Sequence, residues 1–416
     1  MKLLENLKRL GPGLVTGAAD DDPSGIATYS QAGAQFGTGL LWSMLFAYPL
    51  MVAAQLASAR VGRVTGKGLG HSLKAIMPRW LIVILVGLLF VANTINIGAD
   101  LAAMGEATGM TVGTGQHFFT ILFAVASLLL QVFVPYDRYA AILKWATLVL
   151  LAYVALVFMV RVDWLATAHD LFVPHVSGRQ VVTTVVAILG TTISPYLFFW
   201  QAAQEVEEIG QVEEREPLKR ADDQAQDAFN RIRMDTFVGM AVSNLVAMAI
   251  IIGTAATLHA AGKTDIQSAA DAARALQPVA GKLAFAIFTL GIIGTGFLAV
   301  PVLAGASGYA VCEVGGWAGS LQHKPQRAKV FYAVIALGMA LGVFIDWSPI
   351  SPMKALFWSA VINGVVAVPV LVALMLVVSR PAVMGKFVAP LSLKIFGWIA
   401  TAAMAAAAVA MVVIPQ

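Results

Sequence analysis

Apolar runs alternate with short polar connections along the whole chain. Each run is long enough to cross a bilayer as a helix, which takes about 20 residues. About eleven such runs are present, at 10–36, 39–60, 79–104, 116–134, 139–160, 180–208, 233–258, 281–312, 328–345, 354–378 and 392–414. The pattern predicts an all-α integral membrane protein with about 11 transmembrane helices.

The composition agrees with this pattern. The 416 residues are 59% hydrophobic and only 12% charged, whereas soluble domains carry about 25% charged residues. We therefore expect no separate soluble domain. The net charge of +4 reports membrane topology and predicts no nucleic-acid partner. The single cysteine, Cys312, excludes an internal disulfide and a multi-cysteine metal site, and residues 1–10 do not read as a cleaved signal peptide.

Basic residues predict the orientation, because loops rich in Lys and Arg stay in the cytoplasm. With the N-terminus inside, 21 Lys and Arg fall on inner segments and 6 on outer ones. We expect a multi-pass protein of the cell's inner (plasma) membrane, with a cytoplasmic N-terminus and an outer C-terminus. The lipid bilayer is then its surroundings, and we expect it to work as a monomer.

The first run is interrupted by three consecutive carboxylates, a proline and a glycine. They are Asp20, Asp21, Asp22, Pro23 and Gly25. A charged residue at the centre of a membrane helix costs at least about 2.5–3.5 kcal/mol. Broken backbone survives in a membrane only where it lines a cavity or meets other protein. The stretch therefore predicts an ion or substrate site.

The sixth run is interrupted as well, by Gly190, Ser194 and Pro195. Taken alone, Pro195 is equally typical of a simple helix kink. Two breaks five spans apart, in halves of opposite orientation, are the signature of a secondary transporter with its site at the midplane. The pattern predicts a 5+5 inverted repeat, with residues 1–178 as the first repeat, 179–380 as the second and 381–416 as an additional eleventh span.

These breaks and their flanks resemble the NRAMP (natural resistance-associated macrophage protein) family of divalent-metal transporters. The likeness is carried by Gly11-Pro12-Gly13 to Asp22-Pro23, the run from Gln31 to Gly37, Leu40-Leu41-Trp42 and Gly98 to Ala102. The resemblance implies a LeuT-type fold with discontinuous helices 1 and 6. It also implies transport of a divalent metal ion by alternating access around a midplane site.

The resemblance further implies a set of ligands. They are the Asp22 carboxylate, the backbone carbonyls of Ala19 and Thr191, and the Ser194 hydroxyl, directly or through water. Gly25 stands where typical members have a ligand asparagine, and we expect this loss to open the site. The metal ion is the transported substrate, and we expect no cofactor.

The departures from the family motifs suggest which ion is carried. Asp-Pro-Gly-Asn stands here as Asp22-Pro23-Ser24-Gly25, and Met-Pro-His as Ser194-Pro195-Tyr196. Losing the thioether leaves oxygen ligands, which suit Mg²⁺ and Mn²⁺, and Mg²⁺ keeps much of its water. The pattern resembles the NRAMP-related magnesium transporter branch and favours Mg²⁺ and Mn²⁺.

Proton coupling is expected to be absent. Where typical members have proton-transfer glutamates in the third span, this chain has Asn93 and Ala103, if Asp100 is aligned as the retained aspartate. No histidine is predicted at mid-membrane. A divalent cation gains about 2.3 kcal/mol per charge per 100 mV, so uptake needs no proton. The alternatives are a typical proton-coupled Mn²⁺/Fe²⁺ symporter and a channel-like conductance. Gly305-Ala306-Ser307-Gly308 matches the Gly-x-Ser-Gly pattern of rhomboid serine proteases. These proteases take a catalytic histidine from a later span, and no later span has one here, so we expect no enzyme.

Other polar residues are candidates to hold the ion's water or to line its path. Asp20 and Asp21 either do this, or cap a half-helix, or face water. Asn363 has the alternative of an interhelical hydrogen bond. The full set is Asp20, Asp21, Ser24, Asn93, Asn96, Asp100, Tyr196 and Asn363.

Overall fold

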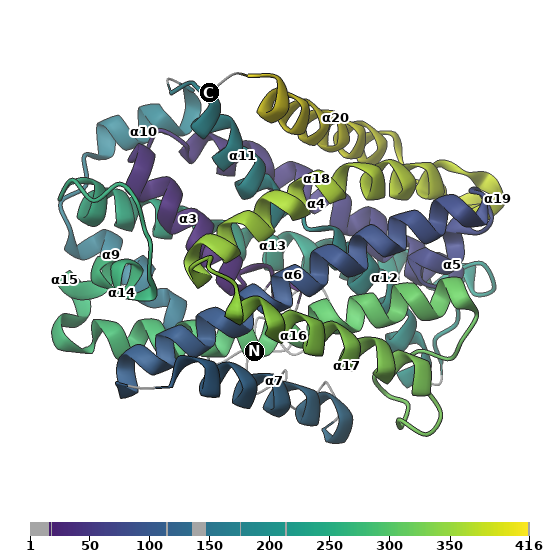
Figure 1. Ribbon diagram of the computed structural model, residues 1–416. Helices are drawn as coiled ribbons and strands as arrows, with labels where there is room; N and C mark the ends of the chain where they lie inside the picture. Colours follow the sequence, from purple (N-terminus) through teal and green to yellow (C-terminus); the bar gives the residue numbers. More distant parts are fainter. Residues whose placement is uncertain are drawn as a thin grey trace, which may run out of the picture.

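The computed structural model describes residues 16–17, 19–113, 115–134, 147–174, 176–212 and 214–414. Within these ranges the protein is helical and has no strand (Figure 1). The helices are α3 (Pro23–Phe36), α4 (Leu41–Thr65), α5 (Leu69–Leu73), α6 (Arg79–Val112), α7 (Gln116–Phe133), α9 (Leu151–Met159), α10 (Trp164–Phe172), α11 (Arg179–Thr192), α12 (Pro195–Gln211), α13 (Ala225–Thr254), α14 (Ala269–Ala273), α15 (Gln277–Ala280), α16 (Ala284–Gly315), α17 (Lys329–Val343), α18 (Pro352–Ser379), α19 (Pro381–Met384) and α20 (Leu391–Val413). A π-helical turn, Ala255–His259, continues α13, and 3₁₀ turns lie at Thr147–Leu150, Asp222–Gln224, Arg274–Leu276, Gly281–Leu283, Phe344–Trp347 and Gly385–Phe387.

Nine helical stretches of the described residues are long and apolar enough to cross a membrane. They coincide with nine of the predicted runs, which confirms a multi-pass, all-helical membrane protein. The other two runs, 10–36 and 139–160, extend into residues outside the described ranges, and their described parts include α3 and α9. The motif at residues 11–13 lies outside the described residues. Helix α6, which contains Ala103, is described throughout.

Both predicted breaks are confirmed, and they have the same local chemistry. Asp22 is the N-cap of α3 and Ser194 the N-cap of α12, both with extended backbone. Each is followed by a proline at the first helical position, Pro23 and Pro195. Proline disfavours helical geometry in the residue before it but suits the first turn of a helix, where its missing N–H is not needed. The Asp-Pro and Ser-Pro pairs therefore begin new half-helices.

The broken helices lie inside the bundle. The half-helix α3 packs on α11, α13 and α18, and the long helix α6 packs on α7, α16, α17 and α18. At the periphery α20 packs on α18, α4 and α11, and Figure 1 shows it at the edge of the bundle opposite α7. The two breaks are thus shielded from lipid by other helices.

Two glycines allow α11 and α18 to touch through their backbones. A Cβ built on Gly190 would collide with the carbonyl oxygen of Ala360 and the backbone of Gly364. A Cβ built on Gly364 would lie 2.6 Å from the carbonyl oxygen of Val186. Small residues are the usual means of close helix packing in membranes.

We predict that Gly190→Ala destabilises the protein, by about 1–3 kcal/mol, as overpacking does. The added methyl group meets backbone atoms, which cannot rotate away as a side chain can. The measurement is the melting temperature of the detergent-solubilised protein. Gly87→Ala is the matched control, because Gly87 lies in α6 with nothing within 4 Å of an added Cβ. Equal melting temperatures for the two variants would contradict the prediction.

Candidate metal site

Asp22 lies at the centre of the candidate site, where the backbone turns into α3. Its Oδ1 accepts hydrogen bonds from the Gly25 amide at 2.8 Å and from the Ser24 hydroxyl at 2.6 Å. These contacts are the capping interaction that a helix N-terminus offers to a carboxylate. They fix the side chain, so that Oδ2 points away from α3 toward α6 and α12.

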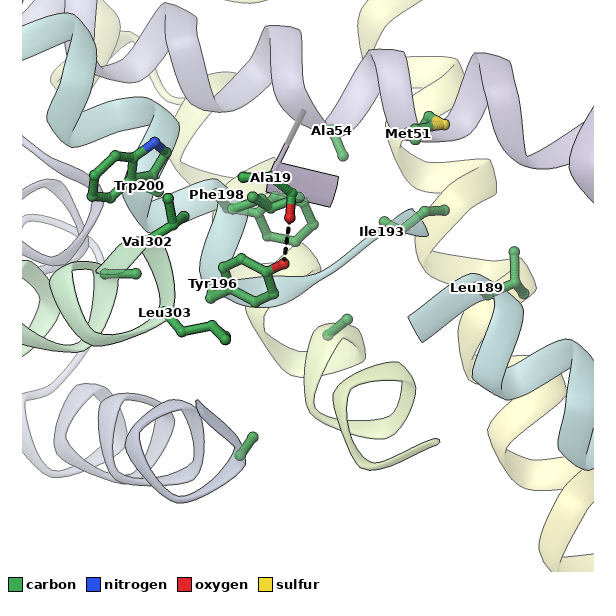
Figure 2. Packing of buried hydrophobic residues seen from close by; sticks show 14 of the residues in the cluster. Ala19, Met51, Ala54, Leu189, Ile193, Tyr196, Phe198, Trp200, Val302 and Leu303 are labelled. Atoms are coloured by element: carbon green, nitrogen blue, oxygen red, sulfur yellow. Dashed lines mark hydrogen bonds between the residues drawn. The ribbon is translucent and has the colours of Figure 1, made fainter. Parts of the chain in front are cut away.

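Tyr196 connects the two broken helices. Its hydroxyl lies 3.3 Å from the carbonyl oxygen of Ala19 and 3.5 Å from Asp22 Oδ2. Figure 2 shows this bond to Ala19, with Ile193 on the extended stretch between Leu189 and Tyr196. A phenol has one proton to donate, and both distances are long for an O–H donor. The Ala19 and Asp22 oxygens therefore keep lone pairs for another partner.

A hydrogen-bonded chain crosses from α18 through α6 to α3. The Ser359 hydroxyl donates to Asn96 Oδ1 at 2.6 Å, and Asn96 Nδ2 donates to Asp22 Oδ2 at 3.0 Å. The same Nδ2 lies 3.5 Å from Asp100 Oδ2. By occupying the amide oxygen, Ser359 turns the amide nitrogen of Asn96 toward the two carboxylates.

Four buried carboxylates gather here without a basic partner. Asp20, Asp22 and Asp100 are at most 1% exposed and Asp21 is 5% exposed. No ion pair includes any of them within the described ranges. Burying a carboxylate is costly unless a cation or a proton compensates it. The arrangement favours binding of a cation.

Asp20 and Asp21 turn toward a different helix from Asp22. Both contact the Ser243 hydroxyl of α13, at 2.8 Å from Asp20 Oδ2 and 3.0 Å from Asp21 Oδ1. Asp20 Oδ1 has no hydrogen-bond partner in the described part of the chain. The two carboxylates are therefore not open to water, which was one of the alternatives for them, and they lie beside Asp22 without sharing its contacts.

The residues expected from the sixth run lie at the end of α11. The Ser194 hydroxyl reaches back to the carbonyl oxygens of Gly190 and Thr191, both at 2.8 Å. It thus satisfies the end of α11 and does not point at Asp22. The Thr191 carbonyl keeps a second lone pair, because a carbonyl oxygen has two.

The Gly25 position is less open than the sequence suggested. A Cβ there would lie 3.2 Å from the Thr191 hydroxyl oxygen and 3.3 Å from the Tyr29 ring. In this conformation the missing side chain allows Thr191 to approach α3. The room expected from replacing an asparagine by Gly25 is filled by these two neighbours.

The remaining candidates fall into two groups. Asn93 donates to the Leu303 carbonyl at 3.1 Å and to the Ser307 hydroxyl at 2.9 Å, so its amide nitrogen faces α16 and not Asp22. Asn363 is 1% exposed, and neither atom of its amide has a partner among the described residues. It follows Ser359 by one helical turn and so lies on the same face of α18. Asn363 is thus directed toward the side of α18 that meets Asn96.

Ser359 and Ser243 were not identified from the sequence. Serines are common in membrane helices, and neither lies in a motif. For Ser359 a signal existed in its i,i+4 spacing to Asn363. For Ser243 the sequence held none, because its contact with Asp20 and Asp21 joins residues more than 200 positions apart.

The groups around Asp22 and Ala19 are hydroxyls, an amide and a backbone N–H, and no sulfur contacts them in the described structure. Within the same ranges no three His, Cys, Asp or Glu side chains are grouped to hold a metal ion. An ion here would have one close carboxylate, backbone carbonyls and water. That set is typical of a hard cation that keeps part of its hydration shell.

Comparison with known proteins gives one family along nearly the whole chain. The family model "Natural resistance-associated macrophage protein-like" (Nramp) matches residues 13–414. The divalent metal cation transporter MntH of Klebsiella pneumoniae (strain 342) is 26% identical over 414 residues, covering 95% of this chain and 91% of the relative. MntH of Caldanaerobacter subterraneus subsp. tengcongensis is 25% identical over 405 residues, covering 93% and 88%.

A solved crystal structure has the same fold. The crystal structure of the Eremococcus coleocola manganese transporter, in complex with an aromatic bis-isothiourea substituted compound, matches with a TM-score of 0.77 at 16% sequence identity. The match covers 98% of this chain and 86% of that one. It confirms the predicted LeuT-type fold. With the family model matching almost from end to end, the chain belongs to the Nramp family.

Proposed function

We propose that the protein moves divalent metal cations, with Mg²⁺ and Mn²⁺ favoured, into the cell by alternating access and without protons. Relatives aligned over nearly the whole chain are named divalent metal cation transporters, which supports transport and not enzymatic catalysis. The solved structure with the same fold is a manganese transporter. The protein would act as a monomer in the inner membrane, with its N-terminus in the cytoplasm.

The observation that carries the proposal is the group of oxygen atoms that lies between the two breaks. Asp22 Oδ2 and the Ala19 carbonyl face the same Tyr196 hydroxyl, and neither is fully satisfied by it. No basic side chain neutralises the surrounding carboxylates in the described part of the chain. A divalent cation would compensate this charge, and in this proposal Asn363 and the Thr191 carbonyl hold the cation or its water.

The preference for Mg²⁺ rests on the ligand types. Ser194 stands where a thioether is typical of the family, and its hydroxyl is hydrogen-bonded to the end of α11. An all-oxygen site loses the preference for softer metals that sulfur gives. The same ligands suit Mn²⁺, which is the reason for proposing both ions.

The absence of proton coupling rests on α6 and α12. Asn93 and Ala103 cannot carry a proton, and Tyr196 takes the place of a histidine beside the site. One observation favours the rival function, a proton-coupled Mn²⁺ symporter. Asp100 is buried 3.5 Å from the Asn96 amide without a basic partner, as a proton acceptor would be. Channel-like conductance has less support, because Asp22 is only 1% exposed in this conformation.

We predict that Asp22→Asn reduces Mg²⁺ and Mn²⁺ uptake into proteoliposomes at least tenfold. The change keeps the size of the side chain but removes the carboxylate that faces the Tyr196 hydroxyl together with the Ala19 carbonyl. Asp223→Asn is the control, because it makes the same change in charge at an exposed position. Wild-type uptake by Asp22→Asn would rule out this site.

We predict that Ser194→Met shifts selectivity toward softer metals. A thioether at position 194, where typical members of the family have one, restores the soft ligand, so Cd²⁺ should bind at least tenfold more tightly relative to Mg²⁺. The measurement is isothermal titration with each ion. Ser194→Ala serves as the control, because it removes the hydroxyl without adding sulfur. Cd²⁺ binding that is equal in the two variants would contradict the role assigned to position 194.

We predict that metal uptake does not acidify the proteoliposome interior. The experiment follows Mn²⁺ entry and internal pH together, at a fixed membrane potential. Metal entry should depend on the potential, because each positive charge gains about 2.3 kcal/mol per 100 mV. Proton entry in proportion to metal entry would replace this proposal by the symporter.

A further inference from the structure

A groove on the surface of the bundle lies apart from the metal site. It is bounded by α4, α13 and the start of α20, and has a volume of about 640 Å³. Its sixteen lining residues include no Asp and no Glu. The groove has a polar end and an apolar end, which suits an amphipathic ligand.

The polar end holds two arginines without acidic partners. Arg60 donates from Nε to the Phe387 carbonyl at 2.9 Å, and its guanidinium lies 4.0 Å from the centre of the Phe229 ring. Arg233 lies on α13, which forms another wall of the groove, and is exposed. Neither forms an ion pair within the described ranges, so both positive charges remain available to an anion. Arginine is well suited to phosphate, because its planar fork of donors matches the phosphate oxygens.

The apolar end extends from these arginines toward the middle of the bundle. It is formed by Tyr48, Leu56, Phe237 and Phe396. Phe237 and Phe396 are each 43% exposed, so the groove opens sideways toward lipid. From Arg60 to Tyr48 the groove follows α4 for about 18 Å, at 1.5 Å per residue. This wall would cover an acyl chain along much of its length.

We propose that the groove binds an anionic diacyl phospholipid, with its phosphate on Arg60 and Arg233 and an acyl chain along Tyr48 and Phe237. Free phosphate would use only the polar end and would leave the apolar wall unexplained. A helix from a second copy would cover the apolar wall, but it would bury the charges of Arg60 and Arg233 without an acidic partner. The bound lipid joins α20 to α4 and α13.

The predicted orientation places the polar end at the cytoplasmic surface. That leaflet carries the anionic lipids, and each Lys or Arg near it gains about 1 kcal/mol. The lipid site itself rests on the groove and not on the transported ion. Failure of the metal-transport proposal would leave it standing.

The test is native mass spectrometry of the full chain, released from micelles that contain phosphatidylglycerol or phosphatidylcholine. We expect one phosphatidylglycerol retained per chain, in clear preference to phosphatidylcholine. The double variant Arg60→Gln/Arg233→Gln should weaken this binding about thirtyfold, since two basic groups are lost. The matched control is Arg220→Gln/Arg327→Gln, which removes two exposed arginines from the same predicted side and should change binding less than twofold.

Further arms keep the proposal open to refutation. If the double variant does not fold, Arg233→Gln alone should weaken binding about fivefold, because one exposed basic group is lost. Equal retention of both lipids, or equal loss in the control, would overturn the proposal. Displacement of the lipid by millimolar inorganic phosphate would overturn it in favour of a phosphate site, and a dimer mass without lipid in favour of a second copy.

Discussion

The structure depends on one feature that is costly in free energy, a carboxylate buried at a break in a membrane helix. Asp22 is stabilised from one side by the start of α3 itself, through the Gly25 amide and the Ser24 hydroxyl. From the other side it meets Asn96 and Tyr196. These donors belong to α6 and α12, so the long central helix and the second broken helix are both positioned by the same carboxylate. None of these donors carries a positive charge, so the negative charge of Asp22 favours binding of a cation.

The hydrogen bonds of this site are unevenly distributed, and that separates the roles of its groups. Asp22 Oδ1 accepts two short bonds, whereas Oδ2 accepts one bond from Asn96 and shares the single phenol proton of Tyr196 with the Ala19 carbonyl. Oδ1 stabilises the start of α3, and Oδ2 keeps a lone pair for another partner. Ser194 makes a similar division on the other side, because its hydroxyl secures the end of α11. A binding site can thus exchange its ion without losing the local structure around it.

The sequence was informative wherever local chemistry decides the structure. The breaks at Asp22-Pro23 and Ser194-Pro195 follow from the geometry of proline, and the transmembrane runs follow from hydrophobicity. It was uninformative wherever two distant segments decide jointly. The partnership of Ser359 with Asn96, the turn of Asp20 and Asp21 toward Ser243 and the contact of Asn93 with α16 all depend on how helices pack. Even Gly25, correctly noted as unusual, has its space filled by Thr191 from another helix.

The close approach of α11 and α18 has a consequence for movement. With backbone against backbone at Gly190 and Gly364, no side chains lie between the two helices to rearrange, and sliding one along the other would separate well-packed atoms. We therefore expect α11 and α18 to move together. On the other side of Ile193, α12 packs on α4 and α16. Any tilting of α11 relative to α12 must be absorbed by the few dihedral angles at Ile193 and Ser194, so a hinge between the two half-helices would lie in this short non-helical stretch.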